Sequence, residues 1–93
     1  MMTFEWDEEK NTINQLKHEV SFEEAQEAFF DSRRLIFDDI DHSTKLEKRY
    51  YCLGKIGTKV CTVRFTYRND IIRIFGAGYW RKEHKIYEKI NQN

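Results

Sequence analysis

The chain has 93 residues, 40% of them hydrophobic and 15% aromatic, which is enough for one domain with a core and too few for two. No stretch approaches the roughly 18 apolar residues of a membrane span, and Met1 to Asp7 does not resemble a signal peptide, so we expect neither membrane insertion nor export. The net charge of zero hides a division, because residues 1–47 hold 5 Lys and Arg against 13 Asp and Glu, whereas residues 48–93 hold 11 against 3.

The N-terminal segment predicts a short strand followed by a helix. Thr3 to Trp6 alternates in polarity and is rich in residues that favour strands. Asp7 is a suitable helix N-cap, with acidic residues after it in the first turn, and the helix is expected to reach about His18. Ile13 and Leu16 are expected on its buried face.

A second helix is predicted directly afterwards. Ser21 and Glu24 have the spacing of a capping box, in which each side chain bonds to the backbone of the other residue. The apolar residues that follow have helical spacing and are expected in the core: Phe22, Ala25, Ala28 and Phe29.

The remainder of the sequence predicts four strands and a last helix. The strands are expected at residues 34–37, 48–54, 59–68 and 71–75. Residues 38–47 form a long polar loop, a feature that is often functional. Gly76 to Gly78 is expected to end the last strand, before a helix from about Trp80 that buries Ile86, Tyr87 and Ile90. We therefore predict one α+β domain over residues 1–93, an antiparallel β-sheet with two N-terminal helices on one face and one C-terminal helix.

Strand alternation predicts which side chains avoid the core. In segment 59–68 one face carries Cys61, Val63, Phe65 and Tyr67, and the other carries Val60, Thr62, Arg64, Thr66 and Arg68. Ile72 and Ile74 join the first face, which puts Arg73 and Phe75 on the second. Guanidinium groups bind phosphate and aromatic rings stack on bases, so this arginine face favours a polyanion, above all RNA. The alternatives are an ordinary solvated face and internal pairing of the two oppositely charged halves.

Other chemistries have less support. Cys52 and Cys61 are too few for a disulfide framework, so we expect reduced, buried thiols and a cytoplasmic location. The three histidines do not have the spacing of metal ligands and no phosphate-binding loop is complete, so neither a metal nor a cofactor is expected. Lys17 and His18 could serve acid–base chemistry or could only offset the helix dipole.

Three blocks of residues carry a resemblance to a known family. The opening block is Phe4–Asp7 with Lys10, Asn14, Lys17 and His18, followed by Ser21–Ala25. The middle block is His42, Glu47–Tyr50 and Gly54, and the closing block is Phe65–Arg68, Ile72–Ile74, Glu83 and Tyr87. The blocks span nearly the whole chain in order, and together they resemble the BrnT family.

The resemblance implies a toxin of a type II toxin–antitoxin system with a RelE-like ribonuclease fold, which cleaves RNA without a metal and inhibits translation and growth. It also implies a BrnA-like antitoxin that binds the toxin in a hetero-oligomer and contacts DNA itself, so that this chain meets DNA only indirectly. No membrane partner is implied. Two alternatives remain: a non-catalytic antitoxin-binding subunit that helps to repress the operon, and a general RNA-binding module.

A metal-free ribonuclease must activate the ribose 2′-hydroxyl, stabilise the phosphorane and protonate the leaving 5′-oxygen. On the resemblance, the catalytic candidates are Arg68 and Arg73 for the phosphorane, Glu47 and His18 for proton transfer, and Arg49 for positioning phosphate. The RNA-binding candidates are Trp6, Lys17, Arg64, Trp80 and Arg81. The sequence departs from the family pattern at Gly78, where an arginine is expected nearby, and Arg81 with Lys82 could replace that charge.

Overall fold

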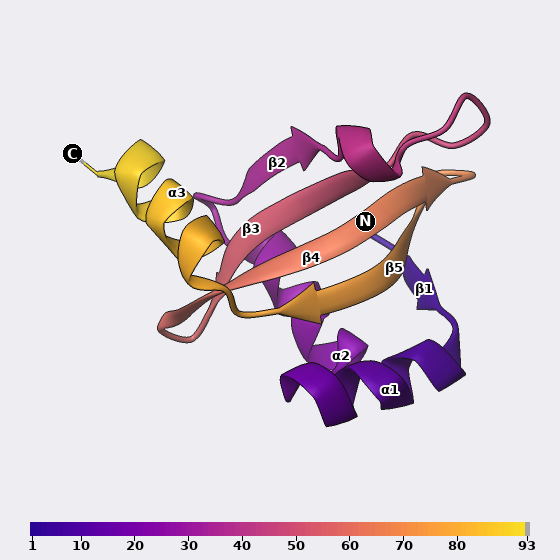
Figure 1. The fold of residues 1–93 in the computed structure, drawn as a ribbon, viewed down its shortest axis with the longest axis horizontal. Helices are drawn as coiled ribbons and strands as arrows, with labels where there is room; N and C mark the ends of the chain where they lie inside the picture. The colour runs from indigo at the N-terminus through magenta and orange to yellow at the C-terminus, as the bar shows by residue number, and fades with distance from the viewer. Residues whose placement is uncertain (93) are drawn as a thin grey trace.

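The computed structural model describes residues 1–92 as a five-stranded sheet with helices packed on both faces (Figure 1). The elements in chain order, with η for 3₁₀ helices, are β1 (Phe4–Trp6), α1 (Glu8–His18), α2 (Phe22–Ala25), η1 (Gln26–Phe30), β2 (Leu35–Asp38), η2 (Ile40–His42), β3 (Tyr50–Ile56), β4 (Lys59–Arg68), β5 (Ile71–Gly78) and α3 (Arg81–Asn91). The strand order across the sheet is β1-β5-β4-β3-β2. Within residues 1–92 no helix has the length and apolar character needed to cross a bilayer.

The predicted helix caps are present. The Asp7 carboxylate accepts hydrogen bonds from the backbone N–H groups of Glu9 and Lys10, at 2.9 and 3.2 Å, and α1 ends at Glu19 in the left-handed region. Ser21 and Glu24 form the predicted capping box. The second helix is shorter than expected, because the α-helical turn of α2 tightens into the 3₁₀ helix η1.

The buried face of α1 is not the predicted one. Ile13 and Leu16 are exposed, whereas Asn11 and Asn14 are buried. Asn11 donates to Glu8 and Glu23 and accepts from the backbone N–H of Phe22, all at 2.8 Å. The helix is thus fastened to the domain by buried amides, which hydrogen-bond on all sides and so tolerate burial.

The predicted α+β fold class is confirmed. The sheet as a whole is mixed, because one of its edge strands pairs in parallel. β3, β4 and β5 are antiparallel hairpin partners as predicted, but β1 runs parallel to β5, with Phe4 opposite Ile72. β5 also continues through Gly78 instead of stopping at Phe75. A register shift opposite Arg64 and Phe65 leaves Phe75 outside the regular pairing, and Ala77 then pairs with Val63.

The face that carries the main core is covered by α2 and η1, whereas α1 packs against β5 and contributes no residue to that core, so the two N-terminal helices do not share one face as expected. Val63, Phe65, Ile72 and Ile74 are buried together there, which confirms the prediction. The phenyl rings of Phe29 and Phe65 meet edge to face at 5.0 Å between centroids. The remaining buried members of this core are Val20, Phe22, Ala25, Ala28, Cys52, Cys61 and Ala77.

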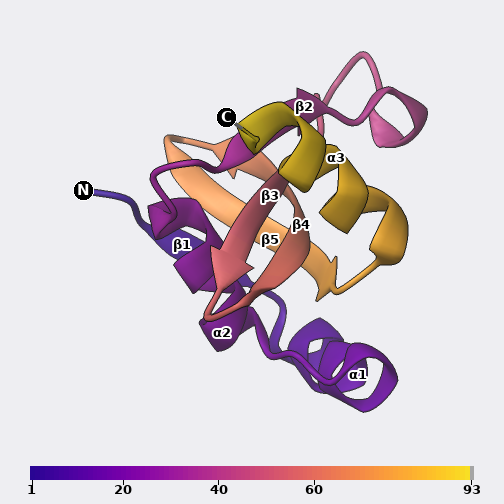
Figure 2. The same ribbon diagram turned by 90° about the vertical axis from the view of Figure 1, so that its left-hand side faces the viewer.

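The opposite face is covered only at one end, by α3 (Figure 2). Tyr87 packs there against Leu53 and Val60, and its hydroxyl donates to Asp31. Val60 and Thr62 are therefore buried, although alternation had assigned them to solvent, because the helix crosses that end of the strand. Thr66 is also buried, with its hydroxyl donating to the Lys48 carbonyl at 2.6 Å.

Two smaller expectations also fail. Tyr67, assigned to the core, is 51% exposed near the end of β4. Its ring makes edge-to-face contacts with the rings of Tyr50 and Phe65. In α3, Ile86 is half-buried and Ile90 is exposed, so Tyr87 is the one of the three predicted apolar residues that is fully buried. Arg64 and Arg68 point away from the core, as predicted, and mark the part of the second face that α3 leaves open.

Candidate functional site

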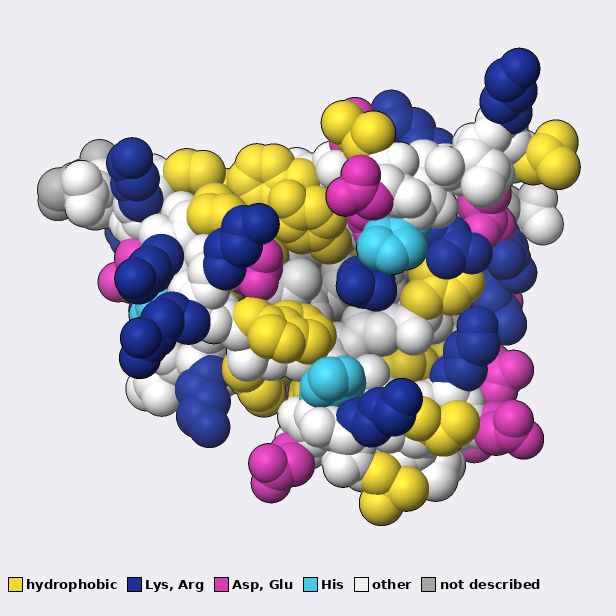
Figure 3. All heavy atoms as spheres, viewed as in Figure 1, with side chains coloured by type: hydrophobic (Ala, Val, Ile, Leu, Met, Phe, Trp, Pro, Cys, Tyr) yellow, Lys and Arg dark blue, Asp and Glu magenta, His cyan; other side chains and the backbone are white. Residues whose placement is uncertain are grey.

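The uncovered part of the sheet holds two adjoining hollows, and Figure 3 shows basic and histidine side chains gathered over it. The first hollow, of about 260 Å³, lies between α1 and β5 and is lined by Lys10, Ile13, Asn14, Lys17, His18, Arg64, Phe75, Gly76, Ala77 and Trp80. The second, of about 400 Å³, lies beside η2 and is lined by Asp39, Asp41, His42, Tyr51, Thr62, Arg64, Trp80, Lys82 and Glu83. We call them the α1 hollow and the η2 hollow. Arg64 and Trp80 belong to both.

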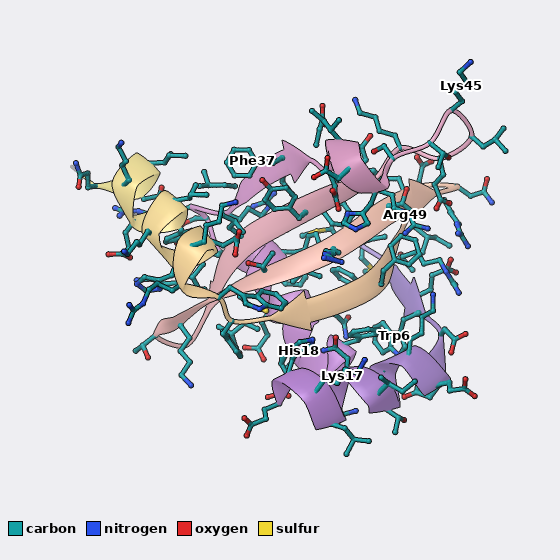
Figure 4. All side chains as sticks on the ribbon, in the orientation of Figure 1. Trp6, Lys17, His18, Phe37, Lys45 and Arg49 are labelled. Carbon is teal, nitrogen blue, oxygen red and sulfur yellow. The ribbon has the colours of Figure 1, made fainter. Side chains whose placement is uncertain are left out.

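Asn14 holds α1 against β5 and so sets the position of the α1 hollow between them. Its side-chain N–H group donates to the carbonyls of Val20 and Ala77, both at 2.9 Å, and its carbonyl accepts from the Ala77 N–H at 3.2 Å. These bonds join α1 to β5, which places Lys17 and His18, in the last turn of α1, at the rim of the sheet (Figure 4). Helical spacing alone marks Asn14 only as a polar residue, so its structural role was not predicted.

Trp80 lies where the α1 hollow and the η2 hollow meet. The His18 and Trp80 rings lie 5.2 Å apart, edge to face. A Cβ atom on Gly78 would lie 2.4 Å from the Trp80 ring, so the ring occupies the space that a side chain at position 78 would need. Glycine at position 78 therefore makes room for the tryptophan at position 80.

A second set of predicted residues meets around Glu47. Its carboxylate bridges two arginines, with Arg68 nitrogens at 2.9 Å and Arg49 nitrogens at 3.1 and 3.2 Å. The hydrogen bond from Arg68, and then that from Arg49, lowers the pKa of Glu47 despite some desolvation. The Arg49 guanidinium lies 4.0 Å from the centroid of Phe75, which also lines the α1 hollow, so this arginine pair adjoins that hollow.

Charge pairing distinguishes the three strand arginines. Arg68 is paired with Glu47, and Arg73 with Glu5 at 3.2 Å across the parallel β1–β5 pair. Arg64 forms no salt bridge or side-chain hydrogen bond with any residue in the described part of the chain. Its guanidinium is therefore the one of these three that is free to bind an external anion.

The η2 hollow contains groups that the sequence did not single out as a site. The Asp39 carboxylate contacts Nδ1 of His42 at 2.9 and 3.0 Å. Burial, and then the charges of Glu83 and Asp39, raises the pKa of Tyr51, so its phenol stays protonated. Tyr51 lies opposite Arg64 in the β3–β4 pair, and the return of the 38–47 loop over β3 brings Asp39 and His42 beside them.

Two predicted RNA-binding residues lie away from both hollows. Trp6 packs edge to face against Phe22 at 6.1 Å, on the helix-covered side, and its indole N–H donates to Glu8. Arg81 lines neither hollow, but the shallow surface that it lines with Lys59 and His84 also includes Trp80, which borders both hollows. The structure therefore joins Lys17, His18, Arg64 and Trp80, brings Glu47, Arg49 and Arg68 next to them, and leaves Trp6, Arg73 and Arg81 apart.

The open face is suited to an anionic, partly aromatic ligand. The α1 hollow has three cationic side chains, and none of the described residues that line it is acidic. No group of three or more His, Cys, Asp or Glu side chains within residues 1–92 is arranged to hold a metal ion.

Two comparisons with known proteins bear on the family of this chain. A search of curated proteins gives no significant match. Residues 6–84 match the family model described as ribonuclease toxin, BrnT, of type II toxin–antitoxin systems. That match covers both hollows and all five strands except the first residues of β1. The chain therefore belongs to the BrnT family of ribonuclease toxins, whose members act as the toxin of a toxin–antitoxin pair.

Proposed function

We propose that this toxin is a metal-independent endoribonuclease that cleaves RNA on the open face of the sheet and thereby inhibits translation and growth. The observation that carries the proposal is the unpaired Arg64 at the junction of the two hollows. One of them, the α1 hollow, is lined by cationic side chains and by no acidic one among the described residues. A phosphodiester bound at Arg64 would lie beside Lys17 and His18 on one side and His42 on the other.

In this proposal the arginines stabilise the phosphorane, which carries more negative charge than the phosphate it comes from. Arg64 contacts the scissile phosphate. Arg68 remains a candidate for the same role and must exchange part of its bond to Glu47 for the phosphate, whereas Arg73, which pairs with Glu5 and lines neither hollow, is not assigned to that phosphate. Arg49 holds a neighbouring phosphate, and Trp80 offers its ring to a base at the mouth of both hollows.

Proton transfer is assigned first to His18. It lines the α1 hollow, so it can reach the leaving oxygen of a phosphate held by Arg64. Glu47 was the other candidate, but two arginines hold it as a carboxylate, which suits it to positioning Arg49 and Arg68. Lys17 beside His18 adds positive charge for the phosphate.

The test compares cleavage with binding. Arg64→Ala should lower single-turnover cleavage of RNA roughly a hundredfold, as expected for loss of one positioned donor to the transition state. Equilibrium binding at fixed salt should fall much less, because the neighbouring cations share the phosphate contacts. Arg33→Ala removes an exposed cation that lines neither hollow and should behave as wild type. Equal and small losses of rate and affinity would indicate a face that only binds RNA.

The proposal extends to the partner and the location. An antitoxin follows from the family, and we propose a BrnA-like protein that forms a hetero-oligomer with the toxin and contacts DNA itself. Cytoplasmic action is consistent with the two free, buried cysteines, Cys52 and Cys61. Co-purification with the product of the adjacent gene tests the partner. A wild-type toxin that cleaves RNA neither free nor on ribosomes would favour the non-catalytic, antitoxin-binding alternative.

A further inference from the structure

The η2 hollow contains an aspartate–histidine pair that the proposed function does not yet use. Asp39 has a side chain only 12% exposed, behind a His42 side chain that is 49% exposed, so the carboxylate lies under the ring and the ring faces the hollow. With Nδ1 engaged by the carboxylate, Nε2 has no hydrogen-bond partner among residues 1–92. A carboxylate on Nδ1 orients the imidazole and leaves Nε2 able to accept a proton.

The same hollow contains a buried hydroxyl without a partner. Thr62 is 6% exposed, and its Oγ1 atom makes no hydrogen bond within the described residues. Buried polar groups are nearly always hydrogen-bonded, and the Thr62 hydroxyl has no such bond within residues 1–92. Thr62 lines the η2 hollow next to Arg64, so its hydroxyl is available to a polar group bound there.

The charges of the two hollows indicate how a nucleotide would lie. The charged and titratable groups around His42 are Asp39, Asp41, Arg49, Tyr50, Tyr51, Arg64, Lys82 and Glu83. Those that line the η2 hollow itself include three carboxylates and two cations, a balance that disfavours a phosphate but suits the hydroxyls of a ribose. The α1 hollow, with Lys10, Lys17 and Arg64, suits the phosphate. Because Arg64 is shared, a phosphate bound there adjoins both hollows.

We propose that the η2 hollow holds the ribose whose 2′-hydroxyl attacks the phosphate, and that His42 is the catalytic base while Asp39 is its positioning residue. This inference rests on the proposed ribonuclease function. The Nε2 atom of His42 takes the 2′-hydroxyl proton, and the 2′-oxygen forms a bond to phosphorus. The bond from phosphorus to the 5′-oxygen breaks, and protonated His18 gives that oxygen its proton. The products are a 2′,3′-cyclic phosphate and a 5′-hydroxyl, with no other reactant.

Sulfur substitution in the RNA distinguishes the role of His42 as base from the role of His18 as acid. The substrate is an RNA whose bridging 5′-oxygen, at the bond that the wild type cleaves, is replaced by sulfur. The thiolate that then leaves needs no proton. His42→Gln should lower cleavage of the normal and the sulfur-containing RNA alike, by roughly a hundredfold or more. His18→Gln should lower cleavage of the normal RNA by a similar factor and regain wild-type rates with sulfur. His84→Gln, which changes a histidine outside both hollows, should leave both rates unchanged.

Asp39→Asn should lower kcat while leaving KM unchanged, and sulfur should not restore the rate, because the loss lies in proton removal. Asp38→Asn is the matched control, since Asp38 is exposed and pairs with Lys48 outside both hollows. Melting temperatures of all variants should stay near that of the wild type.

Wild-type cleavage by His42→Gln, or its rescue by sulfur, would overturn the assignment of His42 as the base. A wild-type toxin that cleaves no RNA would instead overturn the ribonuclease proposal itself, and this inference with it, so the two failures are distinguishable.

Discussion

The two faces of the sheet use the same kinds of residue for different purposes. On the helix-covered face, aromatic rings meet each other: Phe29 contacts Phe4 at 5.3 Å and Phe65 at 5.0 Å, all within or against one apolar core. On the open face, Phe75 is half-buried and its ring contacts cations instead. The guanidinium carbons of Arg49 and Arg68 lie 4.0 and 5.8 Å from the ring centroid. Ring–ring packing stabilises the fold, whereas a ring beneath guanidinium groups holds charges in place at the surface.

The difference separates stability from recognition. Apolar burial supplies most of the folding free energy, and it is concentrated on the helix-covered face and beneath α3. The unpaired Arg64 and the half-exposed His42 contribute little to that free energy, because neither is buried nor held in the core. Variants of the open face should therefore change function without unfolding the protein. Variants of the covered face should instead lower the free energy of unfolding.

The largest effect on stability is expected from matched phenylalanine truncations. Phe65→Ala should lower the free energy of unfolding by about 3–5 kcal/mol, because it leaves a cavity in a fully buried ring cluster. Phe75→Ala should cost clearly less, since that ring is half-buried on the open face. Urea unfolding followed by fluorescence measures both. Equal losses would show that the two faces contribute alike to stability.

An intermediate effect is expected at the glycines of β5. Gly78→Ala should cost about 1–3 kcal/mol, because the added methyl group would overlap the Trp80 ring and push it from both hollows. Gly76→Ala is the control on the same strand, because its added methyl group would meet only the Asn14 side chain at an ordinary 3.9 Å. Thermal unfolding and quenching of Trp80 fluorescence check the pair. An unchanged Trp80 environment in Gly78→Ala would contradict the packing account.

The smallest effect concerns the ion pairs around Glu47. Its pKa is lowered in the folded state, so its bonds to Arg68 and Arg49 stabilise the protein above the unfolded-state pKa and lose that contribution as the pH falls through the folded-state value. Glu47→Gln should therefore be less stable than the wild type near neutrality, by at most about 1 kcal/mol for such partly exposed pairs. The difference should vanish in acid. Melting temperatures recorded across the pH range check this, and a difference that persists in acid would contradict it.

Local sequence signals determined the elements and the identity of the main core. The caps at Asp7 and Ser21 predicted where the two N-terminal helices begin, because a cap is a contact between residues only two or three positions apart. Alternation in β4 correctly separated Val63 and Phe65 from Arg64 and Arg68, because neighbouring side chains in a strand point to opposite faces. The blocks of residues that resemble the BrnT family also lie in the sequence itself, and the match over residues 6–84 confirms the family that they predicted.

Only the tertiary structure decided which polar residues meet. The parallel pairing of β1 with β5 and the burial of Asn14 depend on partners more than 60 positions away, which no local pattern specifies. The same holds for the placement of Asp39 and His42 beside Arg64, since the η2 loop must first fold back over β3. A strand pattern can show that a side chain leaves the core, but its partner on the open face is set by the packing of distant segments. The arginine face was therefore predictable from the sequence, and the two hollows that give it a candidate chemistry were not.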